Sequence, residues 1–304
     1  MDGYALNDGA RGGVENMALD QHLLETAAEQ SCVYLRVYRW SQPTLSLGYF
    51  QPYVQRLTHS ASSELPVVRR ATGGGAIVHH YDWTYCIAVP QSLACRLSDH
   101  NAARATNIGA AQPLYDRVHE GVVEWLSEHG IAAQQWNQSC EAPSPATADR
   151  SRRFLCFERR SCGDVVYGQH KVLGSAQRRS AGAVLQHGSL LLATSPYAPS
   201  LHGLSPNVQS PNLASSTESS LPKPAKDFAG DAARLSPLEL TSQSVLCLPN
   251  SQPGQSDFFQ RLVSIVSQTC GVELKTIRDF AETPCCWQWP RDTRYADNDW
   301  THRI

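Results

Sequence analysis

Apolar residues recur at helical spacing in three segments of the chain. They gather on one side of the stretches 15–29, 110–129 and 256–269, and this pattern predicts three amphipathic helices. Gly130 and Gly271 mark the ends of the second and third helices, because glycine is common just beyond a helix C-terminus. Ser256 is expected to cap the start of the third.

Alternation of apolar and polar residues predicts strands between these helices. The clearest case is 32–40, where Val33, Leu35 and Val37 alternate with tyrosine and arginine. Further strands are expected at 44–51, 65–70 leading into 76–80, 83–90 and 241–248, and three lie within 156–192. The elements do not alternate strictly, so we expect an α+β fold with mixed, largely antiparallel sheets flanked by helices.

The bulk composition narrows the class of protein. The chain has 304 residues, 18% charged, with a net charge of −2, which gives no indication of nucleic-acid or membrane-surface binding. No apolar run reaches about 18 residues, and the start lacks the basic and apolar regions of a secretory signal. A cytoplasmic location with reduced thiols is therefore expected.

We expect one domain over 1–304. Residues 137–153 are expected to form a loop, and 195–236, rich in Ser, Pro, Ala and Asn, a disordered insertion. The ten cysteines do not form paired CxxC motifs. No metal site is therefore expected.

The segment 156–192 carries the strongest candidate chemistry. Four arginines lie within four residues of Cys156, and positive charge favours the nucleophilic thiolate. Lys171 precedes the small residues at 174–176, which leave room for a ligand. Cys156 could also be an inert, half-buried thiol, and Lys171 could face solvent. Cys162 is a second candidate nucleophile, because it lies near the same arginines.

The glycine-rich segment 69–75, RRATGGG, is a second candidate. It is neither a Walker motif nor GxGxxG, and three glycines after a strand commonly form only a turn. Beside two arginines, however, such a loop exposes backbone N–H groups to an anion or a carbonyl. His79 and His80 follow, and on composition alone a histidine at the end of a strand is more often structural than catalytic.

Together these motifs resemble the biotin/lipoate protein ligase catalytic-domain family. The similarity is to its lipoate branch, in particular its cysteine-dependent octanoyltransferases. It rests on NMALD at 16–20, TLSLGYFQ at 44–51, RRATGGGAIVH at 69–79, TYC at 84–86 and the segment 171–190. Several separated motifs in the same order make the resemblance specific, and it implies the catalytic-domain fold of that family.

The resemblance also implies a reaction. In that branch a Cys-Phe pair stands fifteen residues before a binding-site lysine, as Cys156-Phe157 and Lys171 do here. Cys156 would take octanoate from octanoyl-acyl carrier protein as a thioester and pass it to a lysine, with Lys171 polarising the acyl carbonyl. The acceptor would be the glycine-cleavage H protein or a lipoyl domain of a 2-oxoacid dehydrogenase. No cofactor is expected, and the protein is expected to be a monomer.

The resemblance carries over a set of residues expected to line the acyl pocket. They are Arg70, Thr72, Gly73, Gly74, Gly75, His79, Gly174, Ser175, Ala176, His187 and Gly188. Apolar strand residues are expected to enclose the eight-carbon chain, at about 0.8 kcal/mol per buried methylene.

Two other functions stay open at this stage. An ATP-dependent lipoate-protein ligase, which forms a lipoyl-adenylate with ATP and Mg²⁺, would not need Cys156, and Gly75 is commoner in that class. The transferases usually have proline where Arg160 stands and glutamate where Asp164 stands. The second alternative is a non-catalytic lipoyl- or octanoyl-binding protein, against which the intact Cys156 and Lys171 argue.

Overall fold

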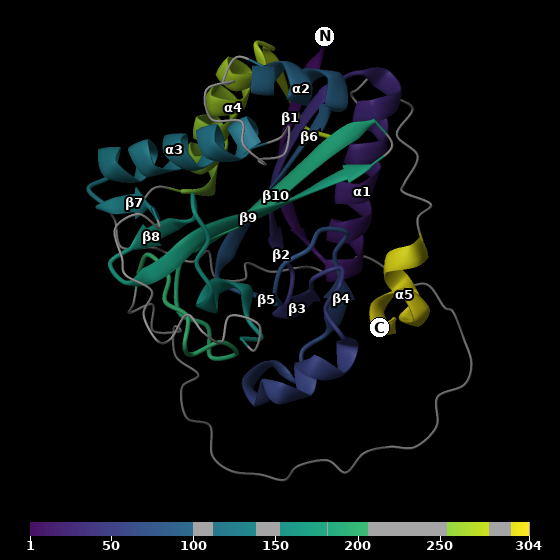
Figure 1. Ribbon diagram of the computed structural model, residues 1–304, viewed down its shortest axis with the longest axis vertical. Helices are drawn as coiled ribbons and strands as arrows, with labels where there is room; N and C mark the ends of the chain where they lie inside the picture. The colour runs from purple at the N-terminus through teal and green to yellow at the C-terminus, as the bar shows by residue number, and fades with distance from the viewer. Residues whose placement is uncertain (100–111, 138–152, 181, 206–253, 280–292, 304) are drawn as a thin grey trace.

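An eight-stranded mixed sheet forms the framework of the protein (Figure 1). The computed structural model describes residues 1–99, 112–137, 153–180, 182–205, 254–279 and 293–303. The strand order is β11-β1-β2-β6-β10-β9-β8-β7. The strands are β1 (Gly3–Arg11), β2 (Val33–Trp40), β6 (Asp82–Pro90), β7 (Ala133–Gln135), β8 (Val165–Tyr167), β9 (His170–Ser180), β10 (Ala183–Leu191) and β11 (Leu274–Ile277). β1 pairs in parallel with β2 and β11, and the remaining pairings are antiparallel.

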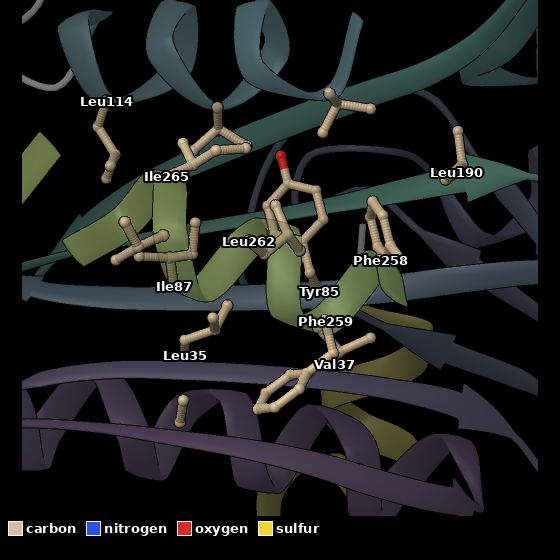
Figure 2. Packing of buried hydrophobic residues seen from close by; sticks show 14 of the residues in the cluster. Leu35, Val37, Tyr85, Ile87, Leu114, Leu190, Phe258, Phe259, Leu262 and Ile265 are labelled. Atoms are coloured by element: carbon tan, nitrogen blue, oxygen red, sulfur yellow. The ribbon is translucent and has the colours of Figure 1, made fainter. Parts of the chain in front are cut away.

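Helices cover both faces of this sheet (Figure 1). α1 (Gly13–Gln30) packs on one face, and α2 (Gln91–Asp99), α3 (Gln112–Glu128) and α4 (Gln255–Cys270) pack on the other. On the second face, Phe258 and Leu262 of α4 lie over Tyr85 and Ile87 of β6 (Figure 2). Full burial of each such side chain contributes about 1.5–3 kcal/mol to the free energy of folding. The apolar layers on the two faces therefore stabilise the packing of the helices on the sheet.

A small three-stranded sheet adds a wall beside α1. β3 (Thr44–Leu47) lies between β4 (Val67–Arg69) and β5 (Ile77–His79). The 3₁₀ turns η1 (Tyr53–Thr58) and η2 (Ser60–Ser62) follow β3. The C-terminal η8 (Thr293–Ala296) and α5 (Asn298–His302) come from the far end of the chain, and α5 packs beside β4 (Figure 1).

Arg69 ties the C-terminal segment to the loop that follows β3. Its buried guanidinium donates hydrogen bonds to the carbonyl oxygens of Gly48, Gln51 and Thr301, at 2.9, 2.6 and 2.9 Å. Trp300 Nε1 donates in return to the Arg69 carbonyl oxygen at 2.9 Å. A buried charge is tolerated only when its donors are satisfied. The loop and the C-terminal segment therefore hold each other in place.

The predicted α+β architecture and the largely antiparallel sheet are confirmed. The three predicted helices are α1, α3 and α4, and Gly271 ends α4 in the left-handed conformation at φ 63°. The predicted cap at Ser256 is wrong. Gly254 precedes α4 instead, and its N–H donates to the Asp257 carboxylate at 2.9 Å.

Two strand predictions need correction. The strand expected over 44–51 ends at Leu47, because residues 48–51 turn back around the Arg69 guanidinium. β1 was missed, since Asn7, Asp8 and Gly9 interrupt its apolar pattern. The parallel partners on both sides stabilise it despite that weak local signal.

Some predictions fall wholly or partly outside the described residues. They are the strand at 241–248, most of the loop at 137–153 and residues 206–236 of the expected insertion. The described part of that insertion, 195–205, forms turns in which Leu201 and Leu204 are buried. Within the described ranges, no helix has the length and apolarity needed to cross a bilayer.

Candidate active site

A cavity lies between the α1-covered face of the large sheet and the three-stranded sheet. It contains about 430 Å³ of empty space, its open mouth included. The lining residues are Met17, Tyr38, Trp40, Ser46, Arg70, Ile77, His79, Thr84, Cys156, Phe157, Gly174, Ser175, Ala176, His187, Gly188 and Ser189. Largely apolar walls with a few converging polar groups are typical of a small-molecule site.

Cys156 reaches this cavity from a short turn, η6 (Cys156–Glu158), that precedes the three predicted strands β8, β9 and β10. Its N–H donates to the Ala76 carbonyl oxygen at 2.7 Å, and the Ala76 N–H donates to the Phe154 carbonyl oxygen at 3.0 Å. Gly75 allows this approach, because a Cβ there would lie 3.0 Å from the Cys156 nitrogen. The glycine loop and the cysteine are thus joined backbone to backbone.

Arg70 is the buried cation beside the thiol. A Cβ on Gly74 would lie 3.1 Å from Arg70 Nη2 and 3.7 Å from Cys156 Sγ, so both groups border the same bare backbone position. Arg70 Nη2 donates to the Gly73 and Gly75 carbonyl oxygens, each at 2.7 Å. Burial lowers the pKa of Arg70 to about 10, while attraction to Cys156 opposes that shift. Arg70 still remains charged at neutral pH.

Three of the four arginines near Cys156 in the sequence lie in the described ranges, and each has another partner. Arg153 donates to the Glu158 carbonyl oxygen at 2.5 Å, and Arg159 donates to the Arg153 carbonyl oxygen. Arg160 donates to a backbone oxygen at 2.6 Å and lies over an indole ring at 4.5 Å. Proximity in sequence therefore pointed to the wrong arginines, and the cation near the thiol comes from the glycine loop.

Lys171 lies against the cavity wall rather than in its lining. Its ammonium forms a buried ion pair of 2.8 Å with Asp164 and lies 5.1 Å from the centre of the Phe157 ring. Asp164 also accepts hydrogen bonds from the Ser161 N–H at 2.7 Å and the Tyr115 hydroxyl at 3.0 Å. These bonds fix the carboxylate, so they also fix the position of the ammonium.

Gly174 provides the space that Lys171 occupies. A Cβ at Gly174 would lie 2.3 Å from Lys171 Cε and 2.6 Å from Nζ. We predict that Gly174→Ala moves the ammonium while the fold remains, because the clash is with the flexible end of a side chain. A displacement of about 1 Å can cost up to about 10²-fold in rate.

The expected result for Gly174→Ala is a transfer rate at least about tenfold lower, with a free energy of unfolding lowered by about 1–3 kcal/mol because the buried Lys171–Asp164 pair is displaced. Gly9→Ala is the matched control, since a Cβ there meets nothing within 4 Å. Single-turnover transfer and urea unfolding measure the two quantities. An unchanged rate in Gly174→Ala would show that the lysine position does not matter.

Two histidines line the cavity, and each is held by a buried aspartate. His79 Nδ1 lies 2.8 Å from Asp82 Oδ2, and the Trp40 ring stacks on the imidazole at 3.9 Å. His187 Nδ1 lies 3.3 Å from Asp20 Oδ2. Burial lowers the pKa of His187, although Asp20 opposes the shift. The aspartates fix the orientation of both rings.

The predicted pocket residues divide into two groups. Those that line the cavity are Arg70, His79, Gly174, Ser175, Ala176, His187 and Gly188. Those that do not are Thr72, Gly73, Gly74 and Gly75. The Thr72 hydroxyl is hydrogen-bonded to His187 Nε2, and the three glycines carry the backbone around Arg70 and Cys156. This second group contacts the lining residues Arg70 and His187 without lining the cavity itself.

Sequence reasoning missed several residues of the site. Tyr38, Trp40 and Thr84 line the cavity from β2 and β6, and Asp20 and Asp82 hold the two histidines. The only sequence signal for Tyr38 and Trp40 was their place on the polar side of an alternating strand. In the fold that side faces α1 and the cavity, so it is not solvent-exposed.

A buried hydrogen-bond chain supports the cavity floor from the α3 side of the sheet. His119 is fully buried; its Nδ1 donates to the Gly163 carbonyl oxygen at 2.7 Å and its Nε2 accepts from the Ser175 hydroxyl at 2.6 Å. A carbonyl oxygen only accepts, so the proton lies on Nδ1. The Tyr85 hydroxyl also bonds to Ser175. Burial lowers the pKa of His119 to about 4.

This shift predicts a loss of stability in acid. The unfolded histidine has a pKa of about 6.5, so between about pH 6.5 and 4 the unfolded state binds the extra proton and unfolding becomes easier. The His119 contribution is on the order of 3 kcal/mol, complete above pH 6.5 and lost toward pH 4. His119→Gln keeps one donor and one acceptor. Urea unfolding at pH 7 and pH 4.5 should show a smaller loss in His119→Gln than in the parent, and an equal loss would contradict the assignment.

The overall fold is that of lipoate-protein ligases. The bipartite lipoate protein ligase of Thermoplasma acidophilum superposes with a TM-score of 0.56 at 16% identity, covering 99% of this chain and 96% of that one. Lipoate-protein ligase A bound with ATP gives a TM-score of 0.55 at 17% identity, with 99% of both chains covered. At these identities the similarity establishes the architecture alone.

The chain belongs to the lipoyl protein ligase A/B catalytic domain family, whose model matches residues 13–227. Among curated relatives, octanoyltransferase LipM of Carboxydothermus hydrogenoformans is 35% identical over 183 residues, and that of Moorella thermoacetica 33% over 190. These matches cover 59% and 62% of this chain, and 61% and 64% of the relatives. The chain thus aligns with less than two thirds of their length.

Proposed function

We propose that this chain is an octanoyltransferase of lipoate assembly. It moves octanoate from acyl carrier protein, through a thioester on Cys156, to a lysine of a lipoyl-accepting protein. The observation that carries the proposal is Cys156, partly exposed on the wall of the cavity, beside the buried Arg70 and with Lys171 over the neighbouring Phe157 ring. The family membership and the names of the curated relatives support it.

In the first step the Cys156 thiolate attacks the carbonyl carbon of octanoyl-acyl carrier protein. The carbon–sulfur bond to the carrier breaks, and the carrier thiol leaves with the proton that Cys156 gave up. The fixed positive charges of Arg70 and Lys171 stabilise the negative charge that develops on the acyl oxygen. One thioester replaces another, so the step is nearly balanced in free energy.

In the second step the neutral amine of the acceptor lysine attacks the Cys156 thioester. A carbon–nitrogen bond forms, the carbon–sulfur bond breaks, and the amine proton leaves with the cysteine as its thiol. Because an amide is more stable than a thioester, this step drives the sequence forward without ATP. No cofactor is needed in this scheme.

The cavity walls fit the acyl chain. Met17, Ile77 and Phe157 give apolar contacts, and Ala176 presents only a methyl group to the cavity. At about 0.8 kcal/mol per buried methylene, an octanoyl tail contributes several kcal/mol of binding. Shorter acyl groups should therefore react with a lower kcat/KM.

A comparison of donors tests the proposed function. An unmodified glycine-cleavage H protein is incubated with the protein and either octanoyl-acyl carrier protein without ATP, or free octanoate with ATP and Mg²⁺. Octanoylation of the H protein only with the first donor is the expected result. Octanoylation only with the second identifies an ATP-dependent ligase, and with neither a binding protein.

A further inference from the structure

An exposed apolar cluster stands on the segment after β3. Phe50, Val54 and Leu57 are 75%, 64% and 62% exposed. They account for three of the six large hydrophobic side chains that the described part of the chain leaves exposed. Single exposed apolar residues need no explanation, but several together on one surface segment mark an interaction site.

The first member of this cluster, Phe50, follows backbone that contacts the glycine loop of the active site. Gly48, two residues before Phe50, touches the glycine loop, because a Cβ there would lie 2.0 Å from the Gly74 carbonyl oxygen. The Tyr49 N–H donates to the Thr72 carbonyl oxygen at 2.8 Å. Phe50 therefore projects from backbone that contacts the glycine loop beside Cys156. Figure 1 shows the helical turns that carry Val54 and Leu57 beneath the three-stranded sheet.

Three arginines lie over the two tyrosine rings of the same segment. The guanidinium carbons of Arg303 and Arg178 lie 3.9 and 4.8 Å from the centre of the Tyr49 ring. Hydrogen bonding and charge from Arg303 lower the pKa of Tyr49, with a smaller contribution from Arg178. Arg56 lies over the Tyr53 ring at 4.8 Å. We call the set Phe50, Val54, Leu57, Arg56, Arg178 and Arg303 the rim surface.

We propose that the rim surface docks the acyl-accepting protein domain, by apolar contact with Phe50 and Leu57 and by pairing of the arginines with carboxylates beside the acceptor lysine. The inference rests on the proposed function. The acceptor is assigned to this surface because of the length of its side chain. The amine of the acceptor lysine is carried on a four-carbon chain, so the acceptor domain must bind directly beside the mouth of the cavity. The donor carries its acyl group on a much longer prosthetic arm and can dock farther away. Aromatic and arginine side chains are also enriched among the hot-spot residues of protein–protein interfaces.

The test separates docking from chemistry with two measurements. Phe50→Ala and Leu57→Ser are compared with Tyr167→Ala, a control that removes a large side chain of 37% exposure from β8. First, titration calorimetry measures binding of unmodified glycine-cleavage H protein to each variant in a Cys156→Ser background. Second, the rate of Cys156 labelling by octanoyl-coenzyme A, a small donor, is followed by intact mass in variants that retain Cys156.

The expected result is acceptor binding weakened about ten- to thirtyfold in Phe50→Ala and in Leu57→Ser. Tyr167→Ala should bind like the parent, and labelling by the small donor should be unchanged throughout. Because the rim is basic, binding should also weaken as salt rises.

Unchanged acceptor binding in the rim variants would overturn the proposal. So would a loss of affinity for octanoyl-acyl carrier protein in place of the acceptor, which would assign the surface to the donor. The calorimetric measurement of acceptor binding does not depend on catalysis. If the parent fails to label at Cys156 with octanoyl-acyl carrier protein as well, the proposed function fails and the docking result still stands on its own.

Discussion

Cys156→Ser should lower octanoyl transfer from acyl carrier protein to an acceptor by at least about a thousandfold. A serine hydroxyl remains protonated beside Arg70 at neutral pH, whereas a thiol is partly ionised and intrinsically more nucleophilic. The side chain is small and only partly buried, so the fold should tolerate the change. Single-turnover transfer with excess enzyme measures the loss.

Cys162→Ser is the matched control for this experiment. Cys162 is an exposed thiol in the same segment, and by electrostatics alone it was an equal candidate. Transfer by Cys162→Ser should match the parent within about twofold, as for other surface substitutions away from a site. If Cys162→Ser loses activity while Cys156→Ser keeps it, the nucleophile has been assigned to the wrong cysteine.

Lys171→Met should have the second large effect, on stability as well as on rate. The substitution leaves the Asp164 carboxylate buried and without its cation, and removing one partner of a buried pair costs about 3–5 kcal/mol. That is a large part of a typical stability of about 5–15 kcal/mol. Transfer should fall by about 10²–10³-fold, because the positive charge near the acyl oxygen is lost.

A double variant separates these two effects. Adding Asp164→Asn to Lys171→Met removes the stranded charge. The amide oxygen can still accept from the Ser161 N–H, and the amide nitrogen can donate to the Tyr115 hydroxyl in place of the bond that the carboxylate accepted. Urea unfolding should show most of the lost stability restored, while transfer stays as low as in Lys171→Met. Recovery of transfer together with stability would mean that Lys171 acts only in folding.

The sequence predicted the helices, strands and motifs that form the site better than the contacts between them. Helical and alternating periodicity placed α1, α3, α4 and most strands, because these patterns are local. The resemblance of separated motifs predicted that the glycine loop, Cys156 and Lys171 belong to one site. Both results depend on information that lies within short stretches of chain.

What the sequence could not show is the set of contacts between those stretches. The Cys156 backbone meets the glycine loop at Ala76, eighty residues earlier in the chain, and this contact places Arg70 at the thiol in place of the neighbouring arginines. Asp20 stands in the NMALD motif and Asp82 between two predicted strands, but neither position indicates that its carboxylate orients a histidine. Long-range pairing decides which of many charged residues becomes buried, and no local pattern records it.

In the proposed reaction Cys156 itself carries the octanoyl group. Intact-mass spectrometry after incubation with octanoyl-acyl carrier protein, without ATP and without acceptor, detects this intermediate. We expect one octanoyl adduct per chain, which is released by neutral hydroxylamine as a thioester is, and which is missing in Cys156→Ser. An unmodified parent chain under conditions where the acceptor still becomes octanoylated, or an adduct that persists in Cys156→Ser, would contradict it.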